Sequence, residues 1–298
     1  MHIEMVEVGP RDGLQNEAVI VSTDDKLALI ARLIDAGSRR LEVASFVNPR
    51  RVPQMADAEA VCAGLPYRPD VTYIGLVMNA RGAERALETR IDQLGAVCVS
   101  TDSFAAANQG QTSDESVEVA CDIIAKARAA GRTGQVTIAG SFGCPFEGEV
   151  SEDRIVAMAE RLATATPVEI ALADTIGVAG PGAVHRLVSR VRVAIAPIPV
   201  RIHLHNTRNT GLANVWAAVE AGVRTVDASL GGLGGCPFAP GAAGNVPTED
   251  VVYMLDRSGM ATGLDLDKLL AANAWFADVM GKQLPGMVSR AGRFPKAA

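Results

Sequence analysis

The sequence is poor in aromatic residues and in histidine, and it has no excess of positive charge. Phe, Trp and Tyr make up 4% of its 298 residues, and it contains four His. A core with so few aromatic rings is built from Val, Ile, Leu and Ala, which is typical of α/β proteins with buried parallel strands. The net charge of −6 argues against a nucleic-acid partner, because such partners normally need a basic surface.

The chain also lacks an apolar segment that could cross a membrane. Its longest stretch without charge, residues 228–248, contains six Gly and three Pro, so we expect a loop there and no membrane helix. The N-terminus has no basic flank followed by an apolar block, so we expect no secretory signal. The five Cys lack CxxC spacing, which favours a reducing cytoplasmic location and thiols that belong mostly to the core.

Short β-branched runs alternate with segments of helical periodicity along most of the chain. The runs have the length of buried parallel strands and cover residues 3–8, 40–44, 71–77, 96–100, 136–140, 168–173, 200–204 and 225–230. Helical periodicity covers residues 24–36, 53–63, 80–89, 114–130, 151–164, 180–194 and 209–221. The first helix has Ser22 or Thr23 as a candidate N-cap and Gly37 as a candidate stop.

This alternation predicts an α/β fold, namely a (β/α)8 TIM barrel, for which about 250 residues are typical. A doubly wound open sheet has the same alternation, but the first strand is followed by GPRDGLQNE and not by a GxGxxG turn. We therefore predict one catalytic domain over residues 1–298, with the barrel in about 1–262. Residues from about 263 to 298 are predicted to form one or two additional C-terminal helices.

Polar residues cluster at the strand ends where TIM barrels carry their active sites. They are Arg11, Asp12, Glu42, Asp174, His203, His205, Cys236 and Asn245. Because side chains two apart on a strand point to the same side, His203 and His205 converge at the barrel mouth. Two hydrogen-bonded structural histidines would give the same spacing. We favour a metal site, since half of the chain's His lie here and Asp12 is close by in a closed barrel.

The residue types at this end of the barrel indicate the chemistry. Two imidazoles, a carboxylate and an amide oxygen, without thiolates, suit Mg²⁺, Mn²⁺, Co²⁺ or Fe²⁺ better than structural zinc. Arg11 could neutralise a carboxylate or an enolate, or form a surface ion pair. Glu42 could pair with Arg11 inside the barrel or take part in proton transfer, and Asp174 could cap the following loop. Cys236, between Gly-Gly and Pro, is the thiol we expect to be reactive.

Six longer motifs stand out. They are EVGPRDGLQNE (7–17), LEVASFVNPRRVPQM (41–55), GCPFEG (143–148), DTIGV (174–178), HLHNT (203–207) and LGGLGGCPFAPGAAGNVPTEDVVYML (230–255). Together they resemble the 3-hydroxy-3-methylglutaryl-CoA (HMG-CoA) lyase family, which belongs to a superfamily of metal-dependent lyases and condensing enzymes. The similarity extends over about residues 3–280.

The resemblance implies a metal-dependent carbon–carbon lyase. Such an enzyme cleaves HMG-CoA to acetyl-CoA and acetoacetate in the retro-Claisen sense. The implied cofactor is Mg²⁺ or Mn²⁺, with Asp12, His203, His205 and Asn245 as ligands. The implied partner is an acyl-CoA thioester, and we expect a cytoplasmic homo-oligomer, a dimer or a tetramer, that acts in leucine degradation and ketone-body metabolism.

The resemblance also implies a set of catalytic residues. These are Arg11, Asp12, Glu42, Asp174, His203 and Cys236. Arg11 would stabilise the enolate of acetyl-CoA, and Glu42 would support proton transfer. Asp12 or His203 would take the hydroxyl proton, and Cys236 or a water would protonate the product carbon.

Departures from the family pattern leave the acyl group open. The chain has HNT and ALADT where animal lyases usually have HDT and SLGDT, and residues 100–112 also differ. Citramalyl-CoA or a longer 3-hydroxy-3-alkylglutaryl-CoA is therefore an alternative substrate. A condensing acyltransferase is less favoured, because such synthases usually carry a long C-terminal region and about 35 residues follow the predicted barrel. A non-catalytic binding barrel would not need a metal with open positions.

Overall fold

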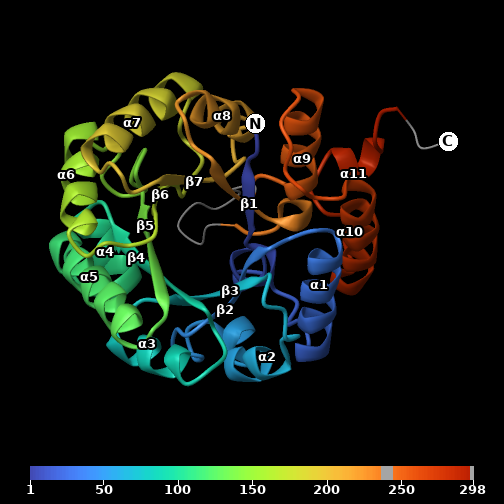
Figure 1. The fold of residues 1–298 in the computed structure, drawn as a ribbon, viewed down its shortest axis with the longest axis horizontal. Coiled ribbons are helices and arrows are strands. Elements are labelled where there is room, and N and C mark those ends of the chain that lie inside the picture. Colours follow the sequence, from blue (N-terminus) through green and yellow to red (C-terminus); the bar gives the residue numbers. More distant parts are fainter. Residues whose placement is uncertain (236–243, 296–298) are drawn as a thin grey trace.

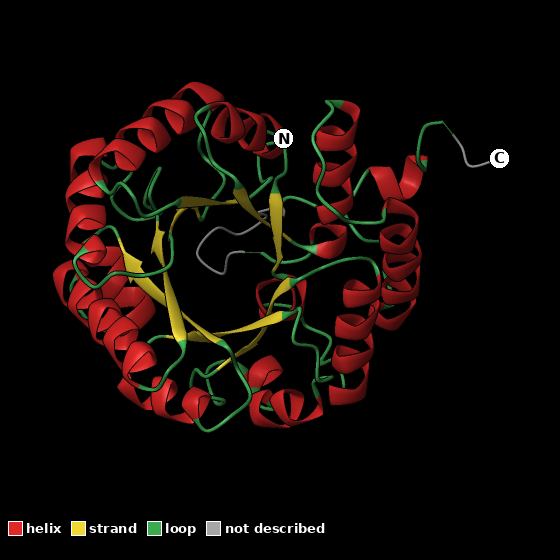
Figure 2. Ribbon diagram, viewed as in Figure 1, coloured by secondary structure: helices red, strands yellow, loops and turns green. Residues whose placement is uncertain are grey.

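Eight parallel strands form a closed barrel in the computed structural model, which describes residues 1–235 and 244–295. The strands pair in sequence order, and β8 closes the barrel by pairing with β1 from Glu4↔Thr225 to Glu7↔Ala228. Helices surround the barrel, and further helices follow near the C-terminus (Figures 1 and 2). The predicted (β/α)8 TIM barrel with additional C-terminal helices is confirmed.

Every predicted strand run overlaps a strand of the barrel. The strands are β1 (Glu4–Glu7), β2 (Arg40–Ser45), β3 (Thr72–Val77), β4 (Gln93–Val99), β5 (Thr133–Ala139), β6 (Ile170–Asp174), β7 (Val200–Leu204) and β8 (Thr225–Ala228). β4 and β5 begin three residues before their predicted runs. Their first residues, Gln93 and Thr133, are polar and bond to each other at 3.1 Å from Nε2 to Oγ1, so an apolar pattern does not reveal them.

The helices occur between the strands and after β8. They are α1 (Thr23–Asp35), α2 (Ala58–Gly64), α3 (Ala80–Leu87), α4 (Asp102–Gln109), α5 (Ser113–Ala129), α6 (Glu152–Ala163), α7 (Pro181–Ala194), α8 (Gly211–Glu220), α9 (Thr248–Arg257), α10 (Leu266–Met280) and α11 (Val288–Ala291). Ser22 caps α1 by accepting a hydrogen bond from the Asp25 amide at 3.1 Å, as its sequence predicts. The predicted helix at 53–63 is split into a short 3-10 turn and α2.

The helical periodicity of the sequence did not predict two of these helices, α4 and α9. The sequence of α4 is short and consists mainly of Ala and polar residues, so it has little amphipathic pattern. The first turn of α9 buries the charged side chains Glu249 and Asp250, which a pattern of apolar buried residues does not predict. Among the described residues, no helix is long and apolar enough to cross a membrane.

Paired polar side chains fill the barrel interior near the N-terminal ends of the strands. We call this set the lower polar layer: Glu4, Arg40, Gln93, Gln135, Glu169 and Arg201. Arg40 pairs with Glu169 and, at 2.8 Å, with Glu4, and it also donates to Gln93 and Gln135. Arg201 Nε lies 3.3 Å from Glu169 Oε1. Each ion of the layer thus has a partner of opposite charge within it.

Candidate active site

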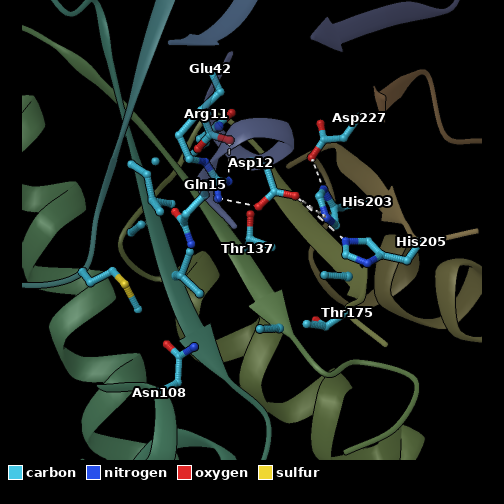
Figure 3. Close-up of a pocket in the computed structure, with 18 of the residues that line it drawn as sticks. Arg11, Asp12, Gln15, Glu42, Asn108, Thr137, Thr175, His203, His205 and Asp227 are labelled. Atoms are coloured by element: carbon cyan, nitrogen blue, oxygen red, sulfur yellow. Dashed lines mark hydrogen bonds and ion pairs between the residues drawn. The ribbon is translucent and has the colours of Figure 1, made fainter. Parts of the chain in front are cut away.

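The turn after β1 brings two charged side chains to the opposite end of the barrel. Residues Gly9–Gly13 form one π-helical turn, in which the amides of Arg11 and Gly13 both donate to the Val8 carbonyl at 3.1 Å. Arg11 and Asp12 line a cavity of about 150 Å³ in the barrel mouth (Figure 3). No local sequence signal predicts this π-helical turn.

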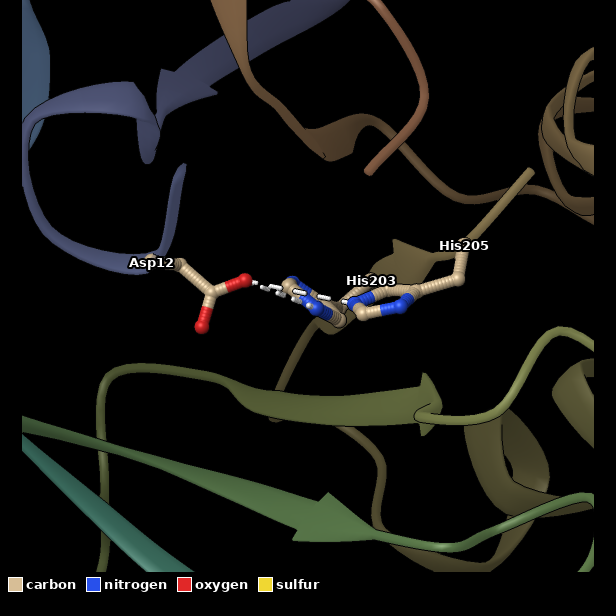
Figure 4. A group of neighbouring side chains, drawn as sticks. All are labelled: Asp12, His203 and His205. Atoms are coloured by element: carbon tan, nitrogen blue, oxygen red, sulfur yellow. Dashed lines mark ion pairs between the residues drawn. The ribbon is translucent and has the colours of Figure 1, made fainter. Parts of the chain in front are cut away.

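His203, in β7, and His205, just after it, face Asp12 across the mouth. Their ring centroids are 5.2 Å apart, and their Nε2 atoms lie 3.8 and 3.9 Å from Asp12 Oδ2 (Figure 4). One candidate ligand atom from each of the three residues lies within 4.8 Å of the other two, so the group could hold a metal ion. The structure therefore brings these three predicted residues together.

Asn245 joins this group because its segment runs along the end of β7. The Asn206 amide donates to the Gly244 carbonyl at 3.0 Å, and the Val246 amide donates to Leu204 at 3.1 Å. Asn245 Nδ2 then donates to Asp12 Oδ2 at 2.8 Å. A Cβ at Gly244 would lie 2.0 Å from the carbonyl oxygen of Gly234, so this approach requires glycine. We call Asp12, His203, His205 and Asn245 the mouth cluster.

Two atoms of the mouth cluster have unused hydrogen-bonding capacity. Within the described part of the chain, His205 Nδ1 and Asn245 Oδ1 are buried without a hydrogen-bond partner. Such atoms are uncommon, because burying a polar group without a partner is costly. Asn245 Nδ2 donates to the Leu233 carbonyl at 3.0 Å as well as to Asp12, so Oδ1 is the atom of this amide that is left to bind a cation. The imidazole nitrogens, the carboxylate and the amide oxygen of the mouth cluster are therefore suitable ligand atoms for a divalent cation.

Arg11 links the mouth cluster to Glu42. Its Nη1 lies 2.5 Å from Asp12 Oδ1, and its Nη2 lies 2.5 Å from Glu42 Oε2. Burial raises the pKa of Glu42. Burial would also raise the pKa of Asp12, but the charges of Arg11, His203 and His205 outweigh it and hold this pKa well below its usual range. The salt bridge to Arg11 is the contact predicted for Glu42 if its role is to pair with Arg11 inside the barrel.

The two histidines differ in what holds them. His203 Nδ1 lies 3.1 Å from Asp227 Oδ2, and Asp227 also accepts from Arg201 Nη1 at 2.8 and 3.0 Å. Burial would lower the pKa of His203, but Asp227 and Asp12 raise it overall. No carboxylate among the described residues bonds to His205 Nδ1, and burial, with the charge of His203, lowers the pKa of His205 to about 4. His205 is therefore neutral near pH 7, the form in which an imidazole binds metal.

Comparisons with known proteins show which family this chain belongs to. The HMGL-like family profile matches residues 2–275, and an (R)-citramalyl-CoA lyase of Chloroflexus aurantiacus is 41% identical over 97% of this chain and 95% of its own. This chain belongs to the HMGL-like family. A hydroxymethylglutaryl-CoA lyase of Bacillus subtilis is 38% identical over 95% of both chains.

A solved HMGL-like relative has the same fold. It is an HMG-CoA lyase from Acinetobacter baumannii in complex with coenzyme A and 3-methylmalate, with a TM-score of 0.95 and 40% identity over 100% of this chain and 97% of its own. The family membership and the lyase class predicted from the sequence are confirmed.

The remaining predicted residues of this HMGL-like protein lie in different places. Asp174 is buried, and its two carboxylate oxygens accept from the amides of Val178 and Ala179 at 2.9 and 3.0 Å. It holds the loop after β6 and is not among the described residues that line the cavity. Cys236 lies outside the described residues. Of the other thiols, Cys62, Cys98 and Cys144 are buried and Cys121 is partly buried.

Several residues of the cavity were not predicted from the sequence. They include Gln15, Asn108, Thr137, Thr175, Arg201 and Asp227. The sequence could have indicated two of these, because Arg201 and Asp227 are charged residues inside runs predicted to be buried strands. The same signal identified Glu42. Gln15, Asn108 and the threonines carry no such signal, since polar residues near strand ends are common in loops.

Proposed function

We propose that the protein is a divalent-metal-dependent carbon–carbon lyase that cleaves HMG-CoA to acetyl-CoA and acetoacetate. The observation that carries this proposal is the mouth cluster, in which Asp12, His203 and His205 converge beside Arg11 in the cavity at the barrel mouth. Membership of the HMGL-like family and full-length relatives named as lyases of CoA thioesters support it.

The cation would be held by Asp12, His203, His205 and Asn245. Mg²⁺ and Mn²⁺ prefer carboxylate and carbonyl oxygens and accept imidazole, which matches this donor set. When bound, the cation supplies Lewis-acid polarisation of the hydroxyl and carboxylate oxygens of the substrate. The convergence of one ligand atom each from Asp12, His203 and His205 supports this assignment, as does Asn245 Oδ1, which has no hydrogen-bond partner among the described residues.

The side chains around the mouth cluster transfer protons and stabilise the enolate. The carboxylate of Asp12 or the imidazole of His203 accepts the proton of the 3-hydroxyl group. The C2–C3 bond then breaks, its electron pair becomes the enolate of acetyl-CoA, and the former hydroxyl carbon becomes the ketone of acetoacetate. Arg11 stabilises the enolate oxygen, and Glu42 holds the guanidinium in place from behind. Protonation of the enolate carbon by Cys236 or a water completes the reaction.

Citramalyl-CoA is the second candidate substrate. It carries a hydroxyl, a methyl and a carboxylate on the same carbon and is one methylene shorter than HMG-CoA, so the same cleavage would give acetyl-CoA and pyruvate. The 41% identity to a citramalyl-CoA lyase favours this candidate.

The decisive assay presents thioesters to the metal-stripped enzyme with and without added Mg²⁺ or Mn²⁺. We expect acetyl-CoA release from HMG-CoA, or from citramalyl-CoA, only with the metal. 3-Methylglutaryl-CoA is the matched control, because it lacks the hydroxyl and cannot be cleaved. Equal turnover in the presence of a chelator, or no turnover of either hydroxyacyl thioester, would refute the proposal.

Three broader proposals go with this activity. We propose a cytoplasmic enzyme that assembles as a dimer or tetramer and takes part in leucine degradation and ketone-body metabolism. The absence of CxxC spacing supports a reducing compartment, and size-exclusion chromatography with light scattering tests the assembly.

A further inference from the structure

The C-terminal helices contact the loop that follows β8, at the mouth end of the barrel. α9, α10 and α11 lie together on one side of the barrel (Figure 1). Between α10 and α11, the Gly286 amide donates to the Gly231 carbonyl at 2.9 Å. Leu284 packs on the same glycine, since a Cβ at Gly231 would lie 2.4 Å from Leu284 Cδ1. The segment beyond the barrel is therefore in direct contact with the loop after β8.

Two buried carboxylates hold this loop by two successive backbone amides. Glu7, at the end of β1, accepts from the Leu230 amide at 2.9 Å. Glu249, in the first turn of α9, accepts from the Gly231 amide at 3.0 Å. Glu7 is 1% exposed and Glu249 is fully buried. We call Glu7 and Glu249 the carboxylate pair, and together they fix the backbone at the start of the loop.

Glu249 also joins the C-terminal helices to the loop. Its Oε1 accepts from Asn273 Nδ2, on α10, at 2.8 Å and from Ser289 Oγ, on α11, at 2.6 Å. Its Oε2 accepts from the Gly231 amide. One carboxylate of α9 thus connects α10, α11 and the loop after β8, so a shift of either helix moves the oxygen atoms that hold the loop.

Glu7 makes the corresponding connection to the turn after β1. Its Oε1 accepts from the Gly9 amide at 2.8 Å as well as from Leu230, and its Oε2 accepts from Thr248 Oγ1 at 2.7 Å. Gly9 begins the π-helical turn that carries Asp12. The carboxylate pair therefore lies between the C-terminal helices and the segments that build the mouth of the barrel.

The donors that reach the carboxylate pair are neutral throughout the described part of the chain. They are backbone amides, hydroxyl groups and the side-chain amide of Asn273. Burial raises the pKa of both carboxyl groups, and the charge of Glu249 adds to this effect on Glu7. Burying a carboxylate without a cation is costly, so the pair is better suited to fixing a geometry than to stabilising the fold.

The loop held by the carboxylate pair reaches the mouth cluster two residues after Gly231. The Leu233 carbonyl accepts from Asn245 Nδ2 at 3.0 Å, and the same nitrogen donates to Asp12 Oδ2 at 2.8 Å. Asn245 is also followed by a contact with the start of the loop, because the residue 248 amide donates to the residue 229 carbonyl at 3.0 Å. The position of this loop therefore sets the position of the Asn245 amide.

We propose that Glu249 is a positioning residue for the metal site and that it transmits the packing of α10 and α11 to Asn245. This inference rests on the proposed function, because it takes Asn245 as a ligand of the cation. Without the Glu249 carboxylate, the Gly231 amide loses its acceptor and the loop is free to shift. The Leu233 carbonyl then no longer holds the Asn245 amide in place. The C-terminal helices thus contribute to metal affinity, although none of the described residues that line the cavity belongs to them.

The first test compares the Mn²⁺ dissociation constants of Glu249→Ala and Glu249→Gln with that of wild type, by electron paramagnetic resonance. Mn²⁺ should bind about tenfold or more weakly to Glu249→Ala. Glu249→Gln should stay within about threefold of wild type, because its amide oxygen can still accept from Gly231. Arg40→Met is the control for a general loss of stability and should bind Mn²⁺ as wild type does. Equal binding by wild type and Glu249→Ala, or equal weakening in Glu249→Ala and Arg40→Met, would overturn the inference.

Ser289→Ala tests the link to the C-terminal helices in a variant that keeps the carboxylate, and it serves also if Glu249→Ala does not fold. It removes only the hydrogen bond from α11 to Glu249 Oε1. We expect Mn²⁺ to bind about threefold more weakly. The matched control is Ser258→Ala, whose hydroxyl bonds to the Met254 carbonyl at the end of α9, and it should bind as wild type does. An unchanged dissociation constant in Ser289→Ala would refute the transmission from α11.

Amide hydrogen exchange of the metal-free protein separates this inference from the proposed function. Exchange is followed by mass spectrometry in a peptide that covers residues 226–235, with β4 as the internal reference. In Glu249→Ala, the amides of this loop should exchange about tenfold faster relative to β4 than in wild type or Arg40→Met. This result would stand even if wild type bound no Mn²⁺ and cleaved no thioester. Equal relative exchange in wild type and Glu249→Ala would contradict the inference and leave the proposed function unaffected.

Discussion

The lower polar layer and the mouth cluster both place charged groups inside one barrel, but they satisfy them differently. In the lower polar layer, Arg40 and Arg201 share Glu169 between them, and the amides of Gln93 and Gln135 accept from Arg40. Arg201 Nη1 donates to Asp227, while its Nε has the ion pair with Glu169 but no hydrogen bond within the described residues. In the mouth cluster, His205 Nδ1 and Asn245 Oδ1 are buried without hydrogen-bond partners among the described residues. Charged groups that pair with one another stabilise a fold, whereas polar atoms without partners in a cavity are available to a ligand.

Asp227 connects these two regions. It accepts from Arg201 below and lies 3.1 Å from His203 Nδ1 above. A carboxylate in that place keeps a proton on Nδ1 and leaves Nε2 free to face Asp12, an arrangement common behind metal-binding histidines. The comparison therefore predicts that substitutions above Asp227 affect chemistry, those below it affect stability, and those at Asp227 affect metal affinity.

The largest expected effect is on activity, from His205→Ala. Loss of one proposed ligand should reduce metal-dependent cleavage by about 10³-fold or more, because the cation no longer binds in place. The unfolding free energy should change by about 1 kcal/mol or less, since His205 Nδ1 has no hydrogen bond to lose within residues 1–235 and 244–295. Steady-state assays and urea unfolding measure both, with the exposed His185→Ala as control. Full turnover by His205→Ala would exclude a ligand role.

Arg11→Met should come next. We expect kcat to fall by roughly 10²- to 10³-fold, because the enolate loses its nearest positive side chain. Binding of Mn²⁺ should persist, since the mouth cluster remains. Mn²⁺ titration by electron paramagnetic resonance and single-turnover kinetics separate these effects, and a less than fivefold fall in kcat would remove Arg11 from the chemistry.

Below Asp227, the effect should be on stability. Arg40→Met removes one of the two cationic partners of the buried Glu169 and should lower the unfolding free energy by about 3 kcal/mol. Urea unfolding tests this, with Arg68→Met, which breaks an exposed pair with Asp70, expected to cause little change. Equal destabilisation by both variants would show that the lower polar layer contributes no more to the free energy of unfolding than an exposed ion pair does.

At the junction, Asp227→Asn should weaken metal binding by about tenfold to a hundredfold. The amide is nearly isosteric, but it no longer fixes the tautomer of His203. The Mn²⁺ dissociation constant is the readout, and Asp250→Asn, which alters a buried carboxylate that accepts from the amides of Met287 and Val288, is the control. An unchanged dissociation constant would show that Asp227 serves only the ion pair with Arg201.

The last prediction concerns pH. Glu7 is buried, which raises its pKa from the ordinary 4.5 to about 7, although it accepts from Gly9, Leu230 and Thr248. A carboxyl group with a raised folded-state pKa contributes stability that is present below about pH 4.5 and is lost as the pH rises through about 7. The difference in unfolding free energy between wild type and Glu7→Gln should follow that course. A difference that is constant from pH 4.5 to 8 would contradict it.

Much of this site follows from the sequence, and the rest depends on contacts between distant segments. His203 and His205 follow from two-residue spacing on a strand, and Asp12 follows from its place at the end of β1. The structure adds the contact that brings Asn245 to them, since residues 244–247 run along the end of β7. Asp227 was readable as a charge in a buried strand, but its pairing with His203 depends on the register of β7 and β8.

The most direct test of the account is the number of Mn²⁺ ions that bind per chain in wild type, His205→Ala and Arg40→Met. We predict one tightly bound ion in wild type, one in the folded fraction of Arg40→Met, and none at the same concentrations in His205→Ala. The two variants would then separate the mouth cluster, which binds the ion, from the lower polar layer, which supports the barrel. Equal binding by wild type and His205→Ala would contradict the central claim.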